Sequence, residues 1–162
     1  MADLSTFSFY YSGNGTPANS IGGAFSGIVV PNSKAALFPN VTLAQASAGV
    51  RQYRCVYLRA GNFQYSDLRL FLSGIGTPSS DSQVYVGLGL AAANAAETAV
   101  ADELTPPEGV VFILPMSELF ALRLPDMAPN TYKSLWLQRV VTGNAQGFVD
   151  DYARIKITGE QR

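Results

Sequence analysis

The run YARIKIT at residues 152–158 alternates small or apolar side chains with polar ones. Because successive side chains of a β-strand point to opposite faces, this period of two predicts a strand with one buried and one exposed face. The buried positions are Ala153, Ile155 and Ile157, and the exposed ones are Arg154, Lys156 and Thr158.

Similar runs recur through the rest of the chain. Residues 68–72 and 84–90 alternate with apolar side chains on one face, and residues 51–59 and 132–141 are rich in aromatic and branched side chains. Glycines at 87 and 89 on the second face of their run predict a bulge or a close backbone approach. In the run at 132–141, residues 136 and 140 are apolar and lie on the face opposite the first apolar face. We therefore expect this strand to be buried on both sides.

Together these runs indicate about eight to ten strands and no long helix, which is typical of an all-β domain. We therefore expect a single β-sandwich or jelly-roll-like domain over residues 1–162. Residues 41–49 allow either one helical turn or a strand edge. Residues 91–101 are expected to be a loop with a short strand around 98–100. Further strands are expected at 110–114 and 120–124.

Residues 12–40 do not fit this regular pattern. Glycine, proline and asparagine interrupt them, yet they contain side chains too apolar for a free loop. We expect an extended N-terminal arm or a long excursion with one or two short strands, whose apolar side chains pack against another subunit. The predicted interface residues are Phe25, Ile28, Val29, Val30, Leu37 and Phe38.

The absence of histidine and the single cysteine narrow the possible chemistry. Without histidine the chain cannot assemble Ser-His-Asp or Cys-His catalysis or a His/Cys zinc site. The acidic pairs Asp150-Asp151 and Asp102-Glu103 lack the spacing of a calcium loop and favour solvated turns. Cys55 lies inside a strand pattern and is expected to be a buried, unreactive thiol. We expect no enzyme activity, no cofactor and no metal.

The charge and hydropathy of the chain do not favour nucleic acid or membranes as partners. The chain has 11 basic and 12 acidic residues, no basic run and no apolar stretch long enough to cross a bilayer. Only 14% of residues are charged, against about 25% in typical domains, which suits extensive contacts with other proteins. Arginines within apolar strands are expected to extend to solvent, to pair with the few acids or to meet a partner subunit; they are Arg54, Arg59, Arg123 and Arg139.

The order of several motifs resembles a family of small virion structural proteins of tailed bacteriophages. The motifs are Gly22-Gly23-Ala24, residues 37–41 (LFPNV), Gly49, residues 53–58 (YRCVYL), residues 86–89 (VGLG), residues 107–112 (PEGVVF), residues 135–139 (LWLQR), Asp150-Asp151 and Gly159. The sequence departs from the family where Ala60-Gly61 precede Asn62, so that turn is expected to differ.

The resemblance implies a β-sandwich protein present in many copies on a particle, such as a capsid decoration (cement) protein. Its implied partners are the major capsid protein, other virion proteins and further copies of itself, and its implied location is the virion. The alternative is a tail-fibre or baseplate component that binds host glycans. A groove with exposed aromatic side chains would favour that alternative, and a flat neutral base with an arm would favour the decoration protein.

Overall fold

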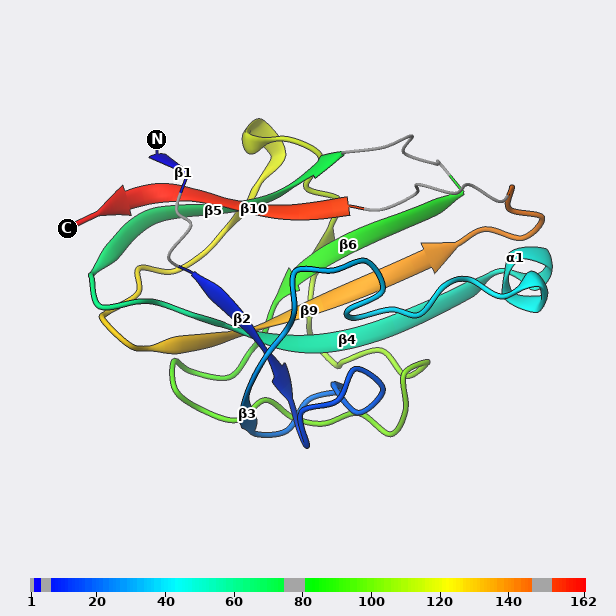
Figure 1. Ribbon diagram of the computed structural model, residues 1–162, viewed down its shortest axis with the longest axis horizontal. Helices are drawn as coiled ribbons and strands as arrows, with labels where there is room; N and C mark the ends of the chain where they lie inside the picture. Colours follow the sequence, from blue (N-terminus) through cyan, green and yellow to red (C-terminus); the bar gives the residue numbers. More distant parts are fainter. Residues whose placement is uncertain (1, 4–6, 75–80, 147–152) are drawn as a thin grey trace.

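A computed structural model describes residues 2–3, 7–74, 81–146 and 153–162. Over these residues the chain is all-β, with strands in two antiparallel sheets (Figure 1). The four-stranded sheet has the order β1 (Ala2–Asp3), β10 (Ala153–Gln161), β5 (Tyr65–Gly74), β8 (Leu122–Arg123). The six-stranded sheet has the order β3 (Phe25–Val29), β2 (Ser8–Ser12), β4 (Val50–Arg59), β9 (Tyr132–Val141), β6 (Ser82–Leu88), β7 (Phe112–Ile113).

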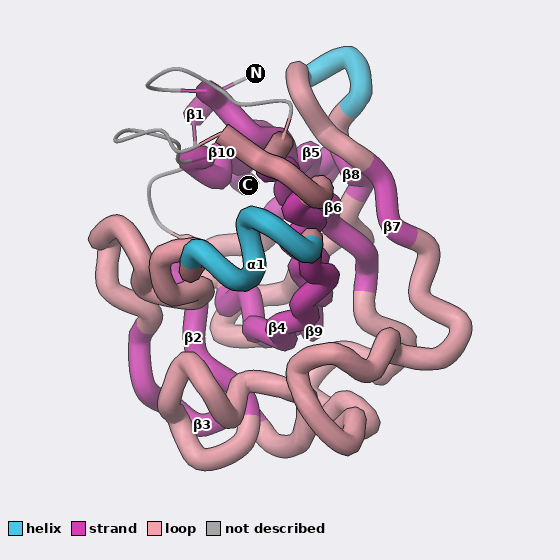
Figure 2. Tube along the Cα trace, turned by 90° about the vertical axis from the view of Figure 1, so that its right-hand side faces the viewer, coloured by secondary structure: helices cyan, strands magenta, loops and turns pink. Residues whose placement is uncertain are grey.

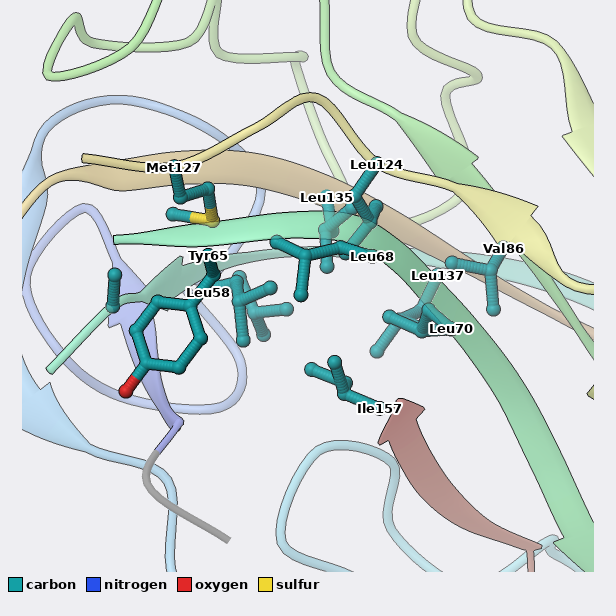
Figure 3. Close-up of a cluster of buried hydrophobic side chains, with 12 residues drawn as sticks. Leu58, Tyr65, Leu68, Leu70, Val86, Leu124, Met127, Leu135, Leu137 and Ile157 are labelled. Atoms are coloured by element: carbon teal, nitrogen blue, oxygen red, sulfur yellow. The ribbon is translucent and has the colours of Figure 1, made fainter. Parts of the chain in front are cut away.

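The alternating runs of the sequence form the long strands, with their apolar faces directed inward. The main core collects side chains from both sheets, including Leu70 of β5, Ile157 of β10 and Leu137 of β9 (Figure 3). Ile157 faces Leu70 in the β10–β5 register and is buried, while Arg154 is exposed, as predicted. Thr158, predicted to be exposed, is buried at 8% exposure, because it bonds to Glu118 of the turn that covers it. Burial of each such apolar side chain contributes about 1.5–3 kcal/mol.

The six-stranded sheet is also covered on its outer face, which is the face directed away from the main core. There Cys55 and Trp136, both fully buried, pack beneath Val110 and Phe112. The long loop between β6 and β7 crosses this face, below β4 and β9 in Figure 1. A Cβ at Gly87 would lie 2.5 Å from Val110 Cγ1, which confirms the predicted close approach at this glycine.

Residues 41–49 adopt the helical alternative as α1 (Leu43–Ala48). Thr42 and Gln45 form a capping box, in which each side chain accepts a hydrogen bond from the backbone N–H of the other. This satisfies two N–H groups that the first turn would otherwise leave unpaired.

Three expected strands are shorter than predicted or are not formed. Residues 98–100 form no strand, and the loop makes only an isolated bridge between Glu97 and Gly23. The runs at 110–114 and 120–124 contribute only the two-residue strands β7 and β8. The apolar side chains at these positions pack against the domain or lie at its surface. Strand propensity alone does not distinguish these roles from a place in a long strand.

Candidate functional site

The segment 12–40 folds back onto the domain and does not project from it. β3 pairs with β2, and Val30, Leu37 and Phe38 pack against the main core of this chain. Phe25 is half-buried, with its ring stacked on that of Tyr132 at a centroid distance of 4.5 Å. Of the two expected alternatives, the described residues form the long excursion, with the short strand β3, and not a projecting arm.

Two of the six predicted interface residues remain open to contact. Ile28 and Val29 on β3 are 50% and 51% exposed. Contact between these two side chains and another subunit stays a prediction.

A pair of buried arginines explains why the segment is held in place. The Phe38 ring lies against both guanidinium groups, 5.4 Å from Arg54 Cζ and 4.9 Å from Arg139 Cζ. Arg54 Nε donates to the Leu37 carbonyl at 3.1 Å, and Arg139 Nη1 donates to the Pro39 carbonyl at 2.5 Å. The arginines therefore bind residues 37–39 to β4 and β9 through both hydrogen bonds and cation–π contacts.

The charges of this cluster are only partly compensated. Arg54 pairs with Glu103, while Arg139 donates to the Gln52 side-chain oxygen at 3.0 Å. Burial lowers the pKa of Arg139 to about 10, an effect to which the positive charge of Arg54 adds. Arg139 therefore remains charged at neutral pH, and its burial makes its hydrogen-bond acceptors important to the packing of the segment.

Three exposed apolar side chains lie within residues 116–120. Met116, Leu119 and Phe120 are 64%, 84% and 66% exposed, and we call them the η1 patch after the 3-10 turn η1 (Glu118–Phe120). Figure 2 shows this turn beyond β5 and β8, on the side away from β4 and β9.

The turn that carries the η1 patch is anchored to the four-stranded sheet. The Leu72 N–H donates to the Pro115 carbonyl at 2.7 Å, and Thr158 Oγ1 donates to Glu118 Oε1 at 2.8 Å. Anchoring reduces the conformational entropy that the turn would lose when a partner covers it. The apolar side chains are thus presented on ordered backbone.

Two arginines next to the patch share one carboxylate. Arg69 and Arg123 face each other across β5 and β8, and each lies 3.3 Å from an oxygen of Asp67. These two guanidinium groups and one carboxylate carry one net positive charge, and the Glu118 carboxylate of the same turn lies nearby, bonded to Thr158, which pairs with Arg69. The Arg123 side chain is 72% exposed, so its charge is available to an acidic group on a partner.

The acidic pairs considered for calcium have other roles where the structure describes them. Asp102 Oδ1 accepts from Leu104 N and Thr105 Oγ1 at 2.9 and 2.8 Å and closes a turn. Glu103 is the partner of Arg54. Asp150 and Asp151 lie outside the described residues.

Cys55 and Glu97 lie in a buried polar network on the outer face of the six-stranded sheet. Burial raises the pKa of the Cys55 thiol to about 12, so the thiol is protonated at neutral pH. Glu97 Oε2 accepts from Ser134 Oγ at 2.6 Å and from the Ala91 N–H at 3.2 Å. These bonds hold the β6–β7 loop onto β9 and supply the buried Glu97 carboxylate with hydrogen-bond donors.

Comparison with protein-family models, curated proteins and solved structures finds no match. No helix in the described part of the chain has the length and apolar character needed to span a bilayer.

The sequence pattern does not predict the η1 patch, because the apolar runs at 110–114 and 120–124 favour two strands. A signal was present between them. Pro115 and Pro125 bracket a short stretch in which Met116, Leu119 and Phe120 lack a period of two. Such apolar residues have no regular inward face, which favours an exposed turn.

Proposed function

We propose that this protein is a bacteriophage virion structural protein, a capsid decoration (cement) subunit that attaches to the major capsid protein through the η1 patch. The observation that carries the proposal is the presentation of three apolar side chains on an anchored turn. Large apolar side chains kept exposed together on ordered backbone are typical of a surface that a partner covers.

The chemistry of the patch defines the surface that it fits. The partner offers an apolar depression for Met116, Leu119 and Phe120, with an acidic group beside it for Arg123. Full burial of one such apolar side chain contributes about 1.5–3 kcal/mol, from which the cost of association is subtracted. Single attachments of this size are moderate, and many copies on one particle add their effects.

Stabilisation of the shell follows from linkage. A subunit that binds the assembled capsid and not the loose capsid protein lowers the free energy of the assembled form. We also infer that the two antiparallel sheets pack as a β-sandwich, while jelly-roll connectivity stays a prediction. Contacts with other virion proteins and with further copies of this chain belong to the same proposal.

Attachment can be tested by adding purified protein back to particles that lack it and measuring the bound fraction by sedimentation. The test variant replaces Met116, Leu119 and Phe120 with serine. A matched control replaces Leu43, Leu90 and Leu104 with serine, since these are 91%, 63% and 57% exposed outside the patch. We expect the patch variant to bind at least about tenfold more weakly and the control to bind like the unchanged protein. Equal attachment of both variants would contradict the proposal.

The rival function, a tail-fibre or baseplate component that binds host glycans, predicts a different phenotype. Particles lacking such a component keep stable heads but fail to adsorb. Capsid attachment and host adsorption are therefore measured on the same particles.

A further inference from the structure

A polar pocket opens at one end of the six-stranded sheet, where β2 and β4 meet the turn that follows β4. Its volume is about 300 Å³, and its polar lining comes from Ser8, Tyr10, Arg59, Asn62 and Asn130. In the β2–β4 register Ser8 lies opposite Arg59, and Tyr10 lies opposite Tyr57. All four therefore lie on the outer face of the sheet.

Arg59 combines partial burial with an unpaired side chain, whereas Arg51 and Arg154, the other strand arginines without a described side-chain partner, are exposed. Arg54, Arg123 and Arg139 each have hydrogen-bond or ion-pair partners within the chain. The Arg59 side chain makes no hydrogen bond or ion pair with any residue that the structure describes, although it is half-buried. A half-buried guanidinium with five donors and no partner among the described side chains is suited to bind an external anion, above all a planar carboxylate.

The pocket walls are held in place by contacts outside the pocket. The Tyr10 ring packs on Phe25 at a centroid distance of 4.8 Å, and Phe25 stacks in turn on Tyr132. The two loops at the rim are joined where the Asn130 N–H donates to the Gly61 carbonyl at 2.8 Å. Binding a ligand would therefore require little ordering of the protein.

We propose that this pocket binds one carboxylate-bearing sugar unit of an acidic glycan. Arg59 would bind the carboxylate, and the Asn62 and Asn130 amides with the Ser8 hydroxyl would bind sugar hydroxyls as donors and acceptors. The Tyr10 ring supplies an aromatic wall for the apolar edge of the sugar. A volume of about 300 Å³ lies at the small end of ligand pockets and suits a single monosaccharide.

The location of the pocket agrees with attachment through the η1 patch but does not depend on it. The pocket is lined from the outer face of the six-stranded sheet. The η1 turn lies beyond β5 and β8 of the four-stranded sheet (Figure 2). A subunit attached through the patch would leave the pocket accessible to a glycan. Because the test below uses the isolated protein, its failure leaves capsid attachment as a separate question.

The test is a titration of the isolated protein followed by amide chemical shifts, with glucuronate, glucose, acetate and inorganic phosphate as probes. We expect saturable shifts at Gly61, Asn62 and Asn130 with glucuronate, and at least about tenfold weaker binding of each of the other three. Glucose lacks the carboxylate, while acetate and phosphate lack the sugar. If phosphate or acetate bound as tightly as glucuronate, the pocket would be a general anion site, and the proposal would be overturned. Absence of saturation would overturn it as well.

The matched variants are Arg59→Gln and Arg51→Gln. Both remove one positive charge from the same face of β4, about 27 Å apart at a rise of about 3.4 Å per residue. We expect glucuronate binding to weaken at least about tenfold in Arg59→Gln and to be unchanged in Arg51→Gln. Asn62→Ala, in an exposed loop, provides a second variant if Arg59→Gln perturbs the fold, and it should also weaken binding. Equal binding by the folded variants and the unchanged protein would contradict the proposal.

Discussion

At the scale of single residues, the two buried arginines Arg54 and Arg139 are each tied to specific neighbours. Arg54 and Arg139 are 2% and 6% exposed, and they lie on the face of β4 and β9 that also carries Val56, Leu58, Leu135 and Leu137 of the main core. Their donors reach backbone carbonyls of residues 37–39 and the side chains of Gln52 and Glu103. The cluster therefore specifies how the N-terminal segment packs, because removing one member leaves the others without partners.

The ion pair of Glu103 predicts a dependence of stability on pH. Burial alone would raise the pKa of Glu103, but hydrogen bonds from Arg54 and Gln52 and the nearby positive charges outweigh burial and lower it. The stabilisation is therefore complete above the pKa of an unfolded glutamate, about 4.3, and is lost as the pH falls through the lower folded value.

We expect Glu103→Gln to lower the thermal unfolding temperature at neutral pH. The difference from the unchanged protein should narrow as the pH falls below about 4.3, because protonation then removes the same ion pair. Thermal unfolding followed by circular dichroism between neutral and acidic pH measures this. Glu108→Gln, at an exposed glutamate, is the control and should follow the unchanged protein. A difference that stays constant with pH would show that the ion pair is not responsible.

At the scale of elements, two long loops are joined across the edge and outer face of the six-stranded sheet. The Gly23 N–H donates to the Glu97 carbonyl at 2.9 Å, and the Val100 N–H donates to the Ile21 carbonyl at 2.9 Å. Gly22 lies at this junction with φ of +101°, and a Cβ there would lie 2.4 Å from the Thr98 carbonyl oxygen. The junction therefore requires glycine for both conformation and space.

A pair of glycine variants separates these two requirements. Gly27 also has a positive φ, +75°, but nothing lies within 4 Å of a Cβ built on it. We expect Gly27→Ala to cost about 1 kcal/mol for the backbone conformation alone. Gly22→Ala should cost about 2–4 kcal/mol, because the backbone of residues 98 and 99 must also move. Denaturant unfolding measures both values, and equal costs would refute the close junction.

The sequence pattern predicts strands in which one face is buried. It does not predict whether that face packs on this chain or on another subunit. Alternation at Leu68, Leu70 and Ile157 led correctly to strands of the main core. Phe38 is equally apolar, but its pattern does not distinguish packing on this chain's own sheet from packing on another subunit. The pocket joins Ser8, Arg59 and Asn130, which are distant in the sequence and become neighbours only through the β2–β4 register and the turn contacts.

At the scale of the whole molecule, the two proposed binding regions lie on opposite sides. The η1 turn lies beyond β5 and β8 of the four-stranded sheet (Figure 2). The polar pocket is lined from the outer face of the six-stranded sheet. The main core between them joins both sheets into one packed unit. This arrangement suits a subunit that attaches by one side and presents the other to its surroundings.

The central claim, that the protein stabilises an assembled capsid, is tested most directly by heating particles with and without it and measuring DNA release. The account predicts that particles lacking the protein assemble, but release DNA at a lower temperature. Adding back the unchanged protein should restore stability, and adding back the variant with serine at Met116, Leu119 and Phe120 should not. Heads that are equally heat-stable without the protein, together with lost adsorption to the host, would contradict the account.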